Sequence, residues 1–79
     1  MISRSEVESF ARSHSSFFNN NYNEALTAEA CFLFENGMSH NLDDDTRLWL
    51  QTYLPASNSA RSRLSSARNS AYQASRIAR

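Results

Sequence analysis

The chain has 79 residues, of which 41% are apolar, enough for one small domain. A domain of this size buries only about 60% of the surface that its unfolded chain exposes, so small domains often depend on a disulfide, a metal or a partner. A single cysteine excludes an internal disulfide, and no Cys/His set has the spacing of zinc ligands. The sequence also lacks lysine and has one glycine, which excludes Schiff-base lysine chemistry and a glycine-rich phosphate loop.

The net charge is zero, but the charges are separated along the chain. Residues 1–56 carry three arginines and eight acidic residues, a net charge of −5, whereas residues 57–79 carry five arginines and no acid, a net charge of +5. We expect a single helical domain, 1–79, with an acidic body and a basic C-terminal helix that attract each other or different partners. Without a signal sequence or a long apolar run, the sequence predicts a soluble, cytoplasmic protein with no membrane partner.

Residues 3–19 have the pattern of an amphipathic helix, with apolar residues recurring at helical spacing. Ser3 and Glu6 have the spacing of a capping box at its start. Glu8 and Arg12 lie four residues apart on the outer side, where we expect them to form an ion pair.

A cluster of asparagines at 19–23 interrupts this pattern, because asparagine side chains compete for backbone hydrogen bonds and tolerate left-handed conformations. The next helix is predicted over 23–36. Its centre, Ala30–Phe34, consists of five consecutive apolar residues and leaves no polar face, so this helix must be covered from several sides. Gly37 suits the left-handed position that ends a helix in a Schellman motif.

A third helix is predicted over 43–54. Asp43, Asp44 and Asp45 interact favourably with the positive end of a helix, and we interpret them as helix-start residues rather than as metal ligands. They also form a candidate acidic surface for a basic partner. Pro55 is expected to end this helix, because proline disfavours helical geometry at the residue before it.

The last helix, predicted over 58–78, carries two stripes of side chains. One stripe alternates by four and three residues and is a candidate self-association seam; its members are Ala60, Leu64, Ala67, Ala71, Ala74 and Ala78. The other stripe, turned by about 110° on the helical wheel, is a candidate partner-binding surface; its members include Arg61, Arg68, Tyr72, Arg76 and Arg79. These arginines have two further interpretations, pairing with the acidic body of the same chain or facing water.

No group of residues has the pattern of a catalytic site. His14 falls on the apolar face of the first helix, where a hydrogen-bonded core histidine is expected, and His40 lies in a loop. Cys31 has no histidine one helical turn away to activate it. Glu24 and Glu29 are candidates for a carboxylate pair only by position. The sequence therefore predicts a protein that is not an enzyme, with no catalytic residue, cofactor or metal.

These observations predict an all-α domain of four helices packed around the second. We expect a non-catalytic interaction protein that docks on a larger protein or nucleoprotein complex and modulates it, by inhibition. Such chains are common among inhibitors carried by phages and other mobile elements, including anti-CRISPR proteins. Two alternatives stay open. One is nucleic-acid binding through the arginine stripe, which zero net charge disfavours, and the other is a homodimeric bundle formed through the alanine seam.

Overall fold

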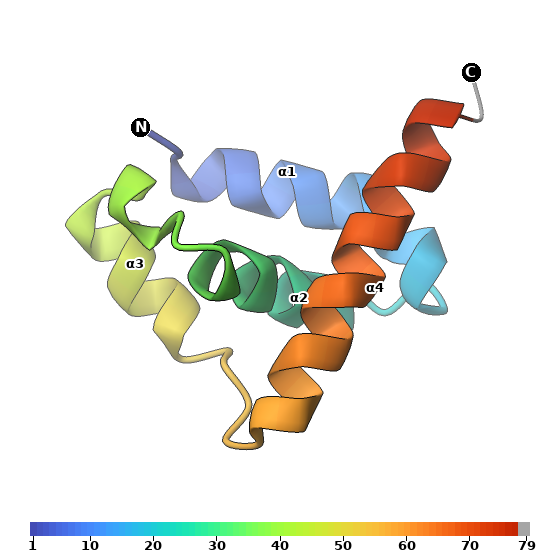
Figure 1. Ribbon diagram of the computed structural model, residues 1–79. Coiled ribbons are helices and arrows are strands. Elements are labelled where there is room, and N and C mark those ends of the chain that lie inside the picture. Colours follow the sequence, from blue (N-terminus) through green and yellow to red (C-terminus); the bar gives the residue numbers. More distant parts are fainter. Residues whose placement is uncertain (78–79) are drawn as a thin grey trace.

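A computed structural model describes residues 1–77 of the chain (Figure 1). Within this range, four α-helices and two short 3-10 helices follow one another, and no β-strand is present. The α-helices are α1, Arg4–His14; α2, Tyr22–Glu35; α3, Asp44–Gln51; and α4, Asn58–Ile77. The 3-10 helices are Ser15–Phe18 and Ser39–Asn41. The prediction of a small all-α domain with four helices is confirmed.

The helix α2 lies at the centre of the molecule. In Figure 1 it has α1 along one side and α3 along another, and α4 crosses it at a steep angle; α2 contacts all three of these helices. Ala28, Ala30 and Cys31 are fully buried. Phe32 and Phe34 are half-buried and pack against the same core. The expectation that the apolar segment of this helix is covered from several sides is confirmed.

Polar side chains begin all four α-helices. The side chains of Ser3, Asn21, Asp43 and Ser57 accept hydrogen bonds from the backbone N–H three residues later, at 3.3, 3.0, 2.8 and 3.3 Å. A bond of this kind satisfies a backbone donor that the helix itself leaves without a partner. Hydrogen bonding to the side chain and backbone of Thr46 lowers the pKa of the Asp43 carboxyl below its ordinary value.

The first helix is shorter than predicted. It ends at His14, and the chain tightens into the 3-10 helix Ser15–Phe18 instead of continuing to residue 19. The Ser15 hydroxyl donates to the carbonyl oxygen of Arg12 at 3.1 Å, and local bonds of this kind compete with regular helical bonding. The tighter turn buries Phe18 and leaves 48% of Phe17 exposed.

The predicted ion pair between Glu8 and Arg12 is wrong. Glu8 lies one turn from both arginines, and its Oε2 lies 3.6 Å from Nε of Arg4. The guanidinium of Arg12 lies instead 5.8 Å from the centre of the Tyr22 ring at the start of α2. Helical spacing alone allowed either pair, and packing against α2 decides between them.

The C-terminal end of α2 has the predicted Schellman motif. Gly37 has a φ of 66°, the Met38 N–H donates to the Leu33 carbonyl at 2.8 Å, and the Gly37 N–H donates to the Phe34 carbonyl at 3.4 Å. The next helix, α3, ends at Gln51 rather than at residue 54. From Thr52 to Leu54, three successive N–H groups bond to carbonyls three residues earlier, so the chain leaves α3 in a tighter turn.

Candidate functional site

The predicted arginine stripe of α4 does not form one continuous surface, because Arg68 points inward. Its Nε lies 3.1 Å from Oε2 of Glu29 on α2, and its Nη2 lies 3.0 Å from Oε1 of the same carboxylate. The side chain of Arg68 is 14% exposed and that of Glu29 is 5% exposed. This two-pronged bond matches the planar fork of a guanidinium to a carboxylate. Arg68 is therefore engaged within the chain.

Aromatic rings enclose this ion pair. The central guanidinium carbon of Arg68 lies 3.9 Å from the centre of the Phe32 ring, 4.3 Å from that of Phe10 and 5.3 Å from that of Tyr72. The rings attract the cation and keep water away from it. Burial of a carboxylate is costly unless it is paired and hydrogen-bonded, and the arginine supplies both. This cluster, which we call the buried arginine cluster, joins α1, α2 and α4.

The predicted alanine seam packs within the chain over most of its length. Leu64 and Ala71 are 6% and 3% exposed, whereas Ala74 is exposed. Small side chains allow α4 to approach α2 closely, and α2 and α4 form the most extensive helix contact of the domain. The buried members of the seam are therefore not accessible to a second copy of the chain. Ala78 lies outside the described residues.

The other members of the arginine stripe have different environments. Nε of Arg61 donates to the carbonyl oxygen of Pro55 at 2.6 Å, which ties the first turn of α4 to the preceding loop. Arg76 is exposed, and its guanidinium carbon lies 5.6 Å from the centre of the Tyr72 ring. Among residues 1–77, none of the ion pairs includes Arg76. Arg79 lies outside the described residues.

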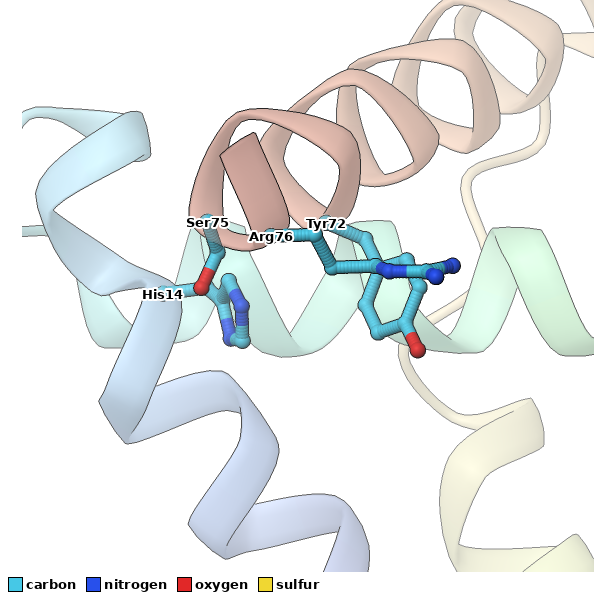
Figure 2. A pocket seen from close by; sticks show the side chains of 4 residues that line it. All are labelled: His14, Tyr72, Ser75 and Arg76. Atoms are coloured by element: carbon cyan, nitrogen blue, oxygen red, sulfur yellow. The ribbon is translucent and has the colours of Figure 1, made fainter. Parts of the chain in front are cut away.

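A hollow of about 620 Å³ lies where the end of α1 meets the last turns of α4. Figure 2 shows His14 and Ser75 on one side of it and Tyr72 and Arg76 on the other. The ring of His14 is stacked on that of Phe10, with centroids 4.1 Å apart and an interplanar angle of 15°. The carbonyl oxygen of Phe10 lies 2.9 Å from Nδ1 of His14, so this nitrogen carries the proton and donates. The predicted hydrogen bond of this histidine is confirmed, and its Nε2 is the nitrogen left for other partners.

One exposed apolar side chain accompanies this hollow. The ring of Phe17, which is 48% exposed, lies with its centroid 6.1 Å from that of His14. We call the combined region the end surface; it consists of His14, Phe17, Tyr72, Ser75 and Arg76.

The sequence predicted part of this end surface. Tyr72 and Arg76 were expected there from the spacing along the last helix. His14, Phe17 and Ser75 were missed, because helical periodicity placed the first two on a core-facing stripe. The Asn19–Asn23 cluster signals that the helix stops nearby, but it does not show that the last turn rotates Phe17 outward.

The acidic residues at the start of α3 lie elsewhere in the fold. Asp43, Asp44 and Asp45 are exposed, and α3 lies on the far side of α2 from the end of α4 in Figure 1. Asp44 pairs with Arg47 at 2.8 Å, and Asp43 caps its own helix. The structure thus gives two of the three aspartates local roles, and their use as a partner surface stays a prediction.

The remaining polar candidates are separated from one another. Burial raises the pKa of the Cys31 thiol, which disfavours the reactive thiolate. Glu24 and Glu29 do not form a pair, since Glu29 bonds to Arg68. His40 was expected in a loop and instead lies, exposed, in the 3-10 helix Ser39–Asn41 before α3. Over residues 1–77, no group of His, Cys, Asp and Glu side chains is arranged to hold a metal ion.

None of the helices described for residues 1–77 combines the length and the apolar character needed to cross a membrane. Comparison of the chain with known protein families, with curated proteins and with solved structures finds no significant match. The residues and geometry of the end surface are therefore the basis for a functional proposal.

Proposed function

We propose that this chain is a non-catalytic interaction protein that docks through its end surface on a larger protein or nucleoprotein complex and inhibits it. The single observation that carries the proposal is the grouping of Tyr72 and Arg76 around a hollow, with the exposed ring of Phe17 beside His14, which lines the same hollow. Tyrosine and arginine are among the residues that most often dominate binding energy at protein interfaces, and they do so in pockets from which water is excluded.

The buried arginine cluster supports this proposal by holding part of the end surface in place. The Tyr72 ring lies 5.9 Å from that of Phe10, and Phe10 stacks on His14. Tyr72 and Phe10 both contact the Arg68 guanidinium, and His14 stacks on Phe10. The hollow is therefore built on packed side chains. A surface that is already ordered loses less conformational entropy when it binds a partner.

The structure weakens the two alternative functions. A phosphate backbone would have to be followed by a row of arginines, yet Arg68 is enclosed and Arg61 is bonded to the loop. A homodimer through the alanine seam would need Leu64 and Ala71, which are buried against the rest of the chain. An anti-defence inhibitor of the anti-CRISPR type is one form of our proposal, and the small size of the chain is consistent with it.

Affinity capture with mass spectrometry tests this proposal. We would compare the wild-type chain with Arg76→Glu on the end surface, with Arg63→Glu as an exposed arginine of the same helix, and with Asp44→Arg on the acidic surface. We expect wild type, Arg63→Glu and Asp44→Arg to retain one stoichiometric partner that Arg76→Glu loses. Retention by Arg76→Glu, or loss only by Asp44→Arg, would place the working surface elsewhere.

A further inference from the structure

We infer that the hollow of the end surface binds a carboxylate side chain of the partner, an Asp or Glu flanked by an apolar residue. This inference rests on the proposed docking function and adds the chemistry of the group that is recognised. It concerns the space between His14, Tyr72, Ser75 and Arg76 rather than the whole face of α4.

Three of the four side chains that line the hollow offer donors to an acceptor-only ligand, whereas the fourth, His14, presents its Nε2 as an acceptor in the tautomer set by its bond to Phe10. Arg76 presents only donors, and the Tyr72 and Ser75 hydroxyls each offer one. Within residues 1–77, these three side chains have no hydrogen-bond partner in the protein, and an arginine fork pairs with a carboxylate through two parallel bonds. The guanidinium now lies over the Tyr72 ring, and as an exposed side chain it is able to turn toward a ligand.

None of the ion pairs described for residues 1–77 occupies Arg76. The last Asp or Glu in the sequence is Asp45, so α4 carries no acidic side chain. The nearby carboxylate on α2, Glu29, is occupied by Arg68 on both oxygens. In the middle of α4, Arg68 therefore already bonds a carboxylate in the way that we propose for the partner. In the last turns, Arg76 belongs to the same stripe and has no carboxylate partner among residues 1–77.

The negative ends of α1 and α4 oppose an anion at this place, because each helix end carries about half an elementary charge. At α1 this charge is reduced, since the Ser15 hydroxyl donates to the Arg12 carbonyl in the last turn. Arg76 contributes a full positive charge directly at the hollow. Hydrogen bonds donated by Arg76, Tyr72 and Ser75 would hold one carboxylate at the hollow. A polyanion would in addition be repelled by the negative helix ends.

The apolar neighbour of the hollow indicates that the carboxylate belongs to a protein. Phe17, beside His14, is 48% exposed, and a side chain of this kind gains by contact with apolar residues of a partner. A nucleic-acid backbone offers no apolar side chain, and the net charge of −5 on residues 1–56 repels it. An acidic residue next to a leucine or phenylalanine satisfies both parts of the end surface.

Nuclear magnetic resonance titration tests this inference with two blocked peptides, Ac-Leu-Glu-Leu-NH₂ and its neutral analogue Ac-Leu-Gln-Leu-NH₂. We expect the glutamate peptide to shift the signals of Tyr72, Ser75 and the Arg76 Nε–H. The glutamine peptide should bind about tenfold more weakly, a difference of about 1.4 kcal/mol. Arg76→Ala should remove the difference between the peptides, and Arg63→Ala should preserve it.

Three results would overturn the inference: equal binding of the two peptides, equal weakening by Arg63→Ala, or tighter binding of inorganic phosphate than of the glutamate peptide at the same residues. Circular dichroism of both variants confirms that α4 stays folded. The docking proposal fails separately. If the peptides discriminate but no captured partner depends on Arg76, the carboxylate site stands and docking is wrong. If a partner depends on Arg76 but the peptides bind alike, docking stands and the carboxylate inference is wrong.

Discussion

Arg68 and Arg76 are two arginines on the same stripe of α4, about two helical turns apart. Arg68 is held in a largely buried ion pair, whereas Arg76 is exposed. Both guanidinium carbons lie beside the Tyr72 ring, at 5.3 and 5.6 Å from its centre. Arg68 lies over α2, where Glu29 and Phe32 enclose it. In Figure 1 the last turns of α4 extend away from α2. Arg76 takes part in none of the ion pairs found within residues 1–77.

This comparison shows that the role of an arginine on a helix is decided by what the helix crosses. Where α4 crosses α2, a basic side chain stabilises the fold. Where α4 extends beyond α2, the same side chain is accessible to another molecule. The basic stripe is therefore divided into a structural part and an exposed part, with Tyr72 between them.

Removing Arg68 should give the largest effect. Arg68→Ala leaves the buried carboxylate of Glu29 without a partner, and breaking a buried pair in this way costs about 3–5 kcal/mol of unfolding free energy. Arg76→Ala should change it by no more than about 0.5 kcal/mol, as is usual for exposed positions. Urea denaturation followed by circular dichroism measures both values, and equal values would contradict the division of the stripe.

The double variant Glu29→Leu/Arg68→Met separates pairing from packing in this result. Replacing a buried ion pair by apolar residues of similar volume is often neutral or stabilising. We expect the double variant to recover most of the stability that Arg68→Ala loses. A double variant as unstable as the single one would mean that the ion pair itself, rather than the unpaired charge, determines the loss.

The two alanines Ala71 and Ala74 extend the same comparison to apolar positions. Ala71 is 3% exposed, so Ala71→Leu should overpack the contact between α2 and α4 and cost about 1–3 kcal/mol. Ala74 is exposed, and Ala74→Leu should stay within about 0.5 kcal/mol of wild type. Thermal unfolding of the two variants provides the measurement, and a stabilising Ala71→Leu would show that this contact is loosely packed.

Arg61→Ala should lower the unfolding free energy by an amount between those of Arg68→Ala and Arg76→Ala. Its bond to the Pro55 carbonyl at 2.6 Å is partly buried, and losing one such bond in Arg61→Ala costs about 0.5–1.5 kcal/mol. Urea denaturation should therefore rank the three arginine-to-alanine variants in the order Arg68, Arg61, Arg76. A different order would show that burial does not determine their contribution.

The helices were predictable because their signals are local. Ser3, Asp43 and Gly37 mark helix ends through bonds to residues within five positions, and the sequence contains both partners of each bond. The central place of α2 followed from Ala30–Phe34, which no amphipathic arrangement accommodates. The exact ends of α1 and α3 differed, since serine side-chain bonds and tight turns shorten a helix without changing its periodicity.

The division of the arginine stripe was not predictable from the same signals. Arg68 and Glu29 lie 39 residues apart in the sequence, and their meeting depends on the crossing of α4 over α2. Charge separation indicated that the basic helix and the acidic body attract each other, but not which arginine pairs. Likewise, Tyr72 and Arg76 could be proposed from one helix, whereas His14 and Phe17 join them only because α1 ends beside α4.

The most direct test of this account is the exchange of arginine Nε–H protons with solvent, measured by nuclear magnetic resonance with and without the glutamate peptide. We predict that the Nε–H of Arg68 exchanges slowly and does not respond to the peptide, and that the Nε–H of Arg76 exchanges rapidly and shifts when the peptide binds. Similar exchange rates for both arginines, or a peptide response at Arg68 alone, would contradict it.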